Sequence, residues 1–185
     1  KNKILLFYAG YLRDLMKFCN RCVNVEPRPA SGGFVEGGCQ ACIFAEASKQ
    51  QTIDWEARDR ELQEIIDWGR KNTRSHYDCI VTVSGGKDSM RQAFFARDEL
   101  GLRPLLVSSV YPPEQLHARG ADNLANLISH GFDTVSMSLN PQVWKKMMRN
   151  AFFRFANQAK STEMALYAIP IHVAIAYKIP LIFLG

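Results

Sequence analysis

The sequence has no long apolar run and no long run of like charges. No stretch approaches the roughly twenty apolar residues that a membrane-spanning helix needs. The apolar segment near the start of the chain is short, and no small-residue cleavage site of a secretory signal follows it. No block of five or six like charges marks a nucleic-acid-binding tail. We therefore expect a cytoplasmic protein with no membrane span.

The chain also lacks internal repeats and low-complexity tracts. Its 185 residues suit one compact domain with a small appendage, and a content of 47% hydrophobic and 22% charged residues is ordinary for a globular fold. The net charge of +5 is modest. It fits a polyanionic ligand such as a nucleotide or a nucleotide sugar, and it fits RNA nearly as well.

Cysteine is scarce and unevenly placed. Four of the five cysteines form two pairs, Cys19-x-x-Cys22 and Cys39-x-x-Cys42, and this spacing allows four thiolates to bind one tetrahedral ion. The glycine- and proline-rich segment between the pairs cannot bury a core of its own, so a metal ion would stabilise it. Structural zinc is the favoured interpretation, with an iron–sulfur cluster and two disulfides as alternatives. Cys79 lies within an apolar run, where we expect a buried, inert thiol.

Short apolar runs alternate with helical patterns along the rest of the chain. The patterns predict strands over residues 78–83, 105–110, 134–139 and 181–184, and helices over 52–70, 88–100, 122–130, 141–159 and 162–177. This alternation predicts an α/β fold with a parallel sheet covered on both faces. Several apolar side chains are expected in its core, namely Ile53, Leu62, Ile65, Ile66, Val143, Met147, Phe152, Phe153 and Phe155. Ser161 or Thr162 is the expected N-cap of the last helix.

The segment Ser84-Gly85-Gly86-Lys87-Asp88-Ser89 separates the first of these strands from a helix. Adjacent glycines let the backbone turn sharply and present N–H groups toward an anion, and the following helix directs its partial positive end to the same point. Two hydroxyls and a lysine complete a phosphate cradle. The GxxxxGK[ST] pattern of P-loop NTPases and the GxGxxG dinucleotide pattern are both absent.

These six residues match the SGGxDS loop of the PP-loop ATP pyrophosphatases, a family with an adenine nucleotide α-hydrolase-like fold. The resemblance implies that residues 84–89 bind the β- and γ-phosphates of ATP, which is split into AMP and pyrophosphate. It also implies catalytic roles for Lys87, which would stabilise charge on the leaving pyrophosphate, and for Asp88, which would help hold Mg²⁺ or orient the loop. It further implies adenine contacts from the backbone at residues 108–110, including Ser109 and Val110. Arg119 is a candidate contact for the α-phosphate, or else a solvated loop residue.

Within that superfamily the chain is most similar to the N-acetyl sugar amidotransferases of bacterial O-antigen and lipopolysaccharide synthesis. The similarity is carried by MKFCNRC (residues 16–22), TIDW (52–55), the 84–89 loop, YPPEQL (111–116) and KSTE (160–163). It implies that ATP adenylates the acetamido oxygen of a UDP-linked N-acetylated sugar, such as a uronate. Ammonia from glutaminase and cyclase-like partner subunits then forms an acetamidino group. The alternative is a tRNA-modifying enzyme of the thiolation type, but no cysteine pair remains to handle sulfur.

This resemblance also suggests a division of the chain. Residues 1–15 are expected to be an N-terminal extension, residues 16–46 a zinc ribbon and residues 47–76 a linking helix. Residues 77–185 are expected to form the ATP-binding PP-loop domain. Because the sequence stops at an apolar strand, we expect the chain to be the N-terminal part of a longer enzyme.

Overall fold

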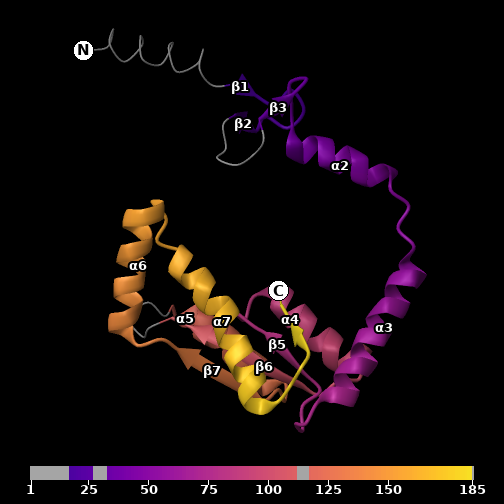
Figure 1. Ribbon diagram of the computed structural model, residues 1–185, viewed down its shortest axis with the longest axis vertical. Helices are drawn as coiled ribbons and strands as arrows, with labels where there is room; N and C mark the ends of the chain where they lie inside the picture. The colour runs from indigo at the N-terminus through magenta and orange to yellow at the C-terminus, as the bar shows by residue number, and fades with distance from the viewer. Residues whose placement is uncertain (1–16, 27–32, 112–116, 185) are drawn as a thin grey trace. The chain divides into compact units, whose positions relative to one another are not determined.

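The computed structural model describes residues 17–26, 33–111 and 117–184, and it divides into two compact units, Lys1–Ala57 and Arg58–Gly185 (Figure 1). The predicted 1–15 extension, residues 112–116 and residues 27–32 of the loop between the cysteine pairs lie outside the described residues. No helix in the described part of the chain is long and apolar enough to cross a bilayer.

The first unit consists of two small hairpins and a helix. Strand β1 (Lys17–Phe18) pairs antiparallel with β2 (Val25–Glu26), and β3 (Phe34–Val35) pairs antiparallel with β4 (Gly38–Cys39). Helix α2 (Gln40–Gln50) follows at once and buries none of its residues. The buried apolar side chains of this unit in the described ranges are Cys19 and Cys39. The cysteines therefore supply the interior that the apolar residues do not.

The second unit contains a four-stranded parallel sheet, and the predicted α/β fold with a parallel sheet is confirmed. Its strands are β5 (Cys79–Thr82), β6 (Pro104–Val110), β7 (Thr134–Ser138) and β8 (Ile182–Phe183), in the order β7-β6-β5-β8. β5 pairs with β6 and β8, and β6 pairs with β7, all in parallel. Since β5 and β6 are central, their carboxyl ends meet in the middle of one sheet edge.

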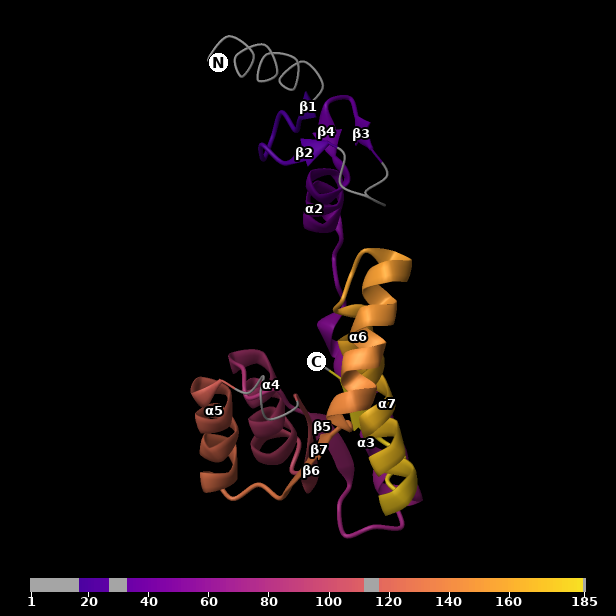
Figure 2. The same cartoon turned by 90° about the vertical axis from the view of Figure 1, so that its left-hand side faces the viewer.

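Helices cover both faces of the sheet. Helices α3 (Trp55–Asn72), α4 (Lys87–Phe94) and α5 (Ala118–Ser129) contribute to one core, and α6 (Pro141–Phe155) and α7 (Lys160–Tyr177) contribute to the other. Figure 2 shows α4 and α5 on one side of the strands and α6 and α7 on the opposite side. Alternate strand residues serve the two cores: Val81 and Leu106 pack with the first, and Ile80 and Val107 with the second. A wider π-helical turn, Phe95–Glu99, extends α4.

The amino-terminal end of β5 is fixed by a charged pair. The Asp78 carboxylate accepts hydrogen bonds from Arg103 Nη2 at 2.8 Å, Nε at 3.1 Å and backbone N–H at 2.9 Å. The Asp78 N–H donates in return to the Arg103 carbonyl at 2.9 Å. This pair ties the start of β5 to the residue that precedes β6.

The predicted core positions on α6 are largely wrong. Val143, Phe152, Phe153 and Phe155 are 47%, 57%, 74% and 60% exposed, whereas Trp144 and Ala151 of the same helix are buried. Sequence periodicity fits both sets, and packing on the sheet selects the one containing Trp144. On α3, Ile66 is buried but Ile65 is 51% exposed. Ile53, which precedes α3, is 46% exposed.

Several predicted helix ends also differ from the structure. α6 stops at Phe155, because Ala156 adopts a left-handed φ of 50°, and does not continue to residue 159. Ser161 is not an N-cap: it lies inside α7, buried, and its hydroxyl donates to the Gln158 carbonyl at 2.9 Å. α5 begins at Ala118, four residues before its predicted start, and His117 Nδ1 caps it by accepting from the Arg119 N–H.

Candidate functional site

The loop of residues 84–89 joins the end of β5 to the start of α4. Gly85 has φ +78°, and a Cβ added there would lie 2.8 Å from Asn123 Cβ and 3.2 Å from the backbone of α5. Only glycine meets both the conformational and the steric requirement at this position. Gly86 is the N-cap of α4 in an extended conformation and makes no side-chain capping bond. The amino-terminal end of α4, with its partial positive charge, is therefore available to an anion.

The two serines hold the loop in shape. Ser89 Oγ donates to the Gly86 carbonyl at 3.0 Å and accepts from the Ser84 N–H at 3.3 Å, and the Gly86 N–H donates to Ser84 Oγ at 3.3 Å. Ser89 is buried, while Lys87 and Asp88 are exposed. Neither Lys87 nor Asp88 forms an ion pair with the described part of the chain. Their charges are thus available to a ligand.

A cavity of about 510 Å³ opens beside this loop. Its polar wall contains Ser84, Gly86, Asp88, Ser89 and Ser109, which the sequence had marked as site residues. Ser109 comes from the carboxyl-terminal part of β6, so the parallel sheet brings the two predicted segments together. The cavity has the size of small-molecule sites in general.

Four other predicted site residues do not line this cavity. Gly85 is buried against α5, Lys87 and Arg119 are exposed, and Val110 is partly buried at the end of β6. Arg119 lies in the first turn of α5, where its N–H meets the capping His117. The structure therefore places Arg119 outside the wall of the cavity.

An apolar part of the cavity wall was missed in the sequence. It includes Leu166, Tyr167 and Pro170 of α7, together with Leu184 after β8. One feature of the sequence could have revealed this wall: α7 carries apolar residues on all its sides. Packing against the sheet explains the apolar residues on one side only, so the others indicate a second apolar contact. One polar wall and one apolar wall suit a ligand with phosphates and a planar ring.

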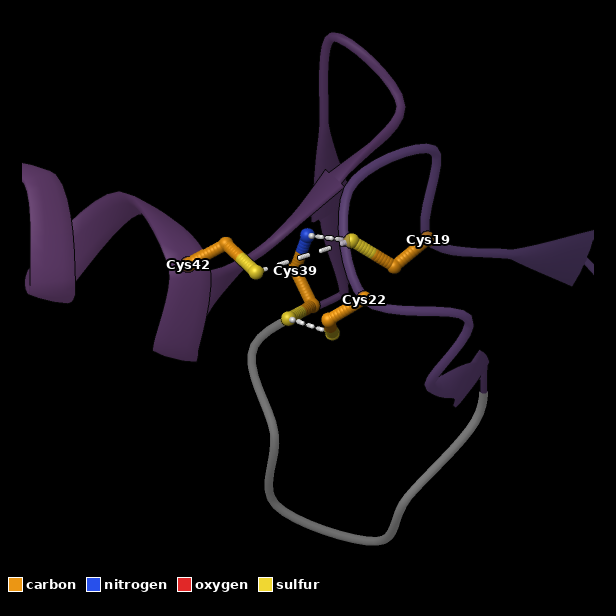
Figure 3. Close-up of side chains that lie close together, drawn as sticks. All are labelled: Cys19, Cys22, Cys39 and Cys42. Carbon is orange, nitrogen blue, oxygen red and sulfur yellow. Dashed lines mark hydrogen bonds between the residues drawn. The ribbon is translucent and has the colours of Figure 1, made fainter.

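The four paired cysteines converge in the first unit (Figure 3). Their sulfur atoms all lie within 4.8 Å of one another, with 3.9 Å between Cys19 and Cys42 and 3.6 Å between Cys22 and Cys39. Cys19 follows β1, Cys39 ends β4 and Cys42 lies on α2. The predicted convergence is confirmed: the four residues are placed to bind one metal ion.

Hydrogen bonds make these thiols unequal. The backbone N–H of Cys39 donates to Cys19 Sγ at 3.2 Å, and this bond is the main reason why the pKa of Cys19 falls to about 6. A bond from the Cys42 N–H likewise lowers the pKa of Cys39. The Cys42 pKa rises to about 12, chiefly through its side-chain contact with Cys22. A bound cation would remove this repulsion between thiolates and allow all four to ionise.

Cys79 belongs to the second unit, where it lies in a central strand of the sheet. It is fully buried in β5, as predicted, and burial raises the pKa of its thiol to about 12. A thiol in this state is a poor nucleophile at neutral pH.

No protein-family model matches the chain, and a comparison with curated proteins found no match either. The loop, the cavity and the cysteine cluster are therefore the features of the chain that bear on its function.

Proposed function

We propose that the second unit is a PP-loop ATP-binding domain, and that the chain belongs to an ATP-dependent amidotransferase acting on a UDP-linked N-acetylated sugar. The observation that carries this proposal is the SGGKDS loop, which stands at a parallel-strand-to-helix turn and borders a cavity of about 510 Å³. Anions bind at such turns because free N–H groups and the helix dipole act together. Cytoplasmic O-antigen synthesis is the setting that the family resemblance suggests.

In this proposal each part of the loop has one task. The N–H groups at the start of α4 bind the outer phosphates of ATP, and the exposed Lys87 stabilises charge on the departing pyrophosphate. Asp88 lines the cavity and would hold Mg²⁺, which neutralises phosphate charge when bound. Ser84 and Ser89 keep the loop rigid through the hydrogen bond between them and through their bonds with Gly86. Ser109 at the end of β6 lies on the adenine side.

The reaction overcomes the low reactivity of an amide. The acetamido oxygen attacks the α-phosphorus of ATP, the bond to pyrophosphate breaks, and an O-adenylated imidate forms. Ammonia then adds to the imidate carbon, and the carbon–oxygen bond breaks to release AMP, which leaves an acetamidino group. The apolar wall formed by Leu166 and Tyr167 would shield the adenylate from water.

Ammonia is expected from a partner subunit. A glutaminase of the cysteine type needs an accessible, activated thiol. In this chain Cys79 is buried with a raised pKa, and the other four cysteines form the cluster in which we propose structural zinc. The same distribution disfavours the thiolation alternative, which needs a reactive cysteine near the nucleotide.

Pyrophosphate release tests the proposal. The purified chain is incubated with ATP, Mg²⁺, ammonium and a UDP-N-acetylated sugar, and pyrophosphate is measured with a coupled enzyme assay. We expect sugar-dependent release that falls by about 10²-fold in Lys87→Ala, because one preorganised charge at the leaving group is lost. Lys71→Ala, an exposed lysine in the last turn of α3, is the matched control and should leave the rate unchanged. Absence of release with every sugar, together with a non-hydrolysable ATP analogue bound away from the loop, would contradict the proposal.

A further inference from the structure

The outward side of α6 is basic and aromatic. Lys145, Lys146, Arg149, Phe152 and Phe153 are all exposed, and their spacing places them on one side of the helix. The other side carries the buried Trp144 and Ala151 against the sheet. Figure 1 shows α6 beside α7 at the margin of the second unit. We refer to these five exposed residues as the basic face of α6.

Helix α6 is positively charged along its length. α6 contains four cations and no acidic residue, while the whole chain has a net charge of +5. No ion pair in the described part of the chain involves Lys145, Lys146 or Arg149. A cluster of cations without internal counter-charges favours an external polyanion.

The aromatic residues form a compact apolar group at the end of the basic face. Phe152 and Phe153 meet edge to face with ring centroids 5.9 Å apart, and Arg149 stacks over Phe153 at 5.7 Å. Phe155 and, at the start of α7, Met164 are also more than half exposed. Because the Phe152 and Phe153 rings meet edge to face, at 74°, they do not present parallel planes on which successive bases could stack, and the group is better suited to burial among acyl chains.

We propose that the basic face of α6 binds the anionic surface of a lipid bilayer, with Phe152 and Phe153 entering the interface. Cations near an anionic membrane each strengthen binding by about fivefold, and exposed aromatic side chains add burial at the headgroup level. The surface adds a peripheral membrane contact to the chain. It does not depend on the proposed reaction, since the polar loop and its cavity involve none of these five residues.

Vesicle co-sedimentation of the full chain tests this inference. The probes are vesicles of phosphatidylcholine with about 30% phosphatidylglycerol, and vesicles of phosphatidylcholine alone. We expect binding to the anionic vesicles only, and at least a tenfold loss at high salt, where the screening length falls to about 3 Å. Equal binding to both kinds of vesicle, or none to either, would overturn the inference.

Paired variants separate the basic face from net charge. Lys145→Glu with Lys146→Glu should weaken binding by about 20-fold or more, whereas Lys49→Glu with Lys71→Glu, which changes charge equally on α2 and α3, should weaken it by less than about threefold. Phe152→Ser with Phe153→Ser should weaken binding while keeping its salt dependence. All these positions are exposed, and unchanged circular dichroism confirms folding. The proposal fails if the control variant, Lys49→Glu with Lys71→Glu, loses as much vesicle binding as Lys145→Glu with Lys146→Glu. It also fails if a single-stranded oligoribonucleotide binds this face and vesicles do not.

Discussion

Gly85→Ala is the substitution whose cost the structure defines best. The added methyl carbon would lie 2.8 Å from Asn123 Cβ, about 1 Å closer than carbon atoms normally approach. The backbone of α5 lies 3.2 Å away, so the contact cannot be relieved by rotating one side chain. The residue also needs φ +78°, which alanine adopts only with strain. Two separate penalties therefore act at one position.

Their sizes can be worked out with Gly131 as a control. Gly131 has φ +84° but no atom within 4 Å of an added Cβ, so Gly131→Ala measures the backbone strain alone. We expect Gly131→Ala to lower the free energy of unfolding by about 1 kcal/mol, partly offset by a stiffer unfolded chain. Overpacking costs a further 1–3 kcal/mol or so, which gives about 2–4 kcal/mol for Gly85→Ala.

Urea denaturation followed by circular dichroism measures the loss of unfolding free energy in each variant. Titration with a non-hydrolysable ATP analogue measures how well the loop of each variant still binds the nucleotide. Gly85→Ala should weaken binding of the analogue because the loop must move away from α5. Gly131→Ala should bind as the parent chain does. If the two variants lose the same stability and bind equally well, the close approach of the loop to α5 does not limit the fold, and the reasoning is refuted.

Three further outcomes are expected. Metal analysis of the chain purified under reducing conditions should find one zinc ion, and the absorbance of an iron–sulfur cluster would contradict this. Zinc binding at neutral pH should release protons, because the pKa of Cys42 is about 12 and its thiol is protonated before the metal binds. Asp78→Asn should lower the free energy of unfolding by about 1–2 kcal/mol at pH 7, allowing for the exposed side of Arg103. The hydrogen bonds from Arg103 lower the pKa of Asp78, so this stabilisation is present above the ordinary pKa of 3.8 and is lost as pH falls through the folded-state pKa. The urea denaturation curves of the parent chain and of Asp78→Asn should therefore converge in acid. A difference in the free energy of unfolding that stays constant with pH would argue against the pair. Cys79 should resist a thiol reagent at pH 8 until the chain is unfolded, and rapid labelling would show that β5 opens.

The sheet and the cysteine cluster were predictable because local patterns determine them. β-branched runs ending at Gly85 or at a proline-rich segment mark parallel strands, and their carboxyl ends meet at one edge. That rule alone brings Ser109 to the cavity beside Ser84. The spacing of the two Cys-x-x-Cys pairs predicts that four thiolates can reach one ion, and the four sulfurs do lie within 4.8 Å of one another.

The packing of α6 and α7 could not be predicted in the same way. On α6, apolar residues occupy almost every side near Phe152, so the helical period allows more than one buried stripe. The stripe that contains Trp144 is selected because the large indole is buried in the core that also contains Leu105 and Val107, and this burial depends on the tertiary structure. The cavity wall at Tyr167 was missed for the same reason: a helix that is apolar all round does not show which side faces a ligand.

The charged pair at Asp78 and the glycine loop at Gly85 lie at opposite ends of one short central strand. We expect a substitution at the first end to weaken the whole unit and to leave the shape of the loop unchanged in those molecules that remain folded. A substitution at the second end alters the ligand-facing surface directly. Substitutions at Asp78 and Arg103 can therefore change the stability of this domain without changing its ligand-binding loop, because the hydrogen-bonded residues of β5 lie between the two sites.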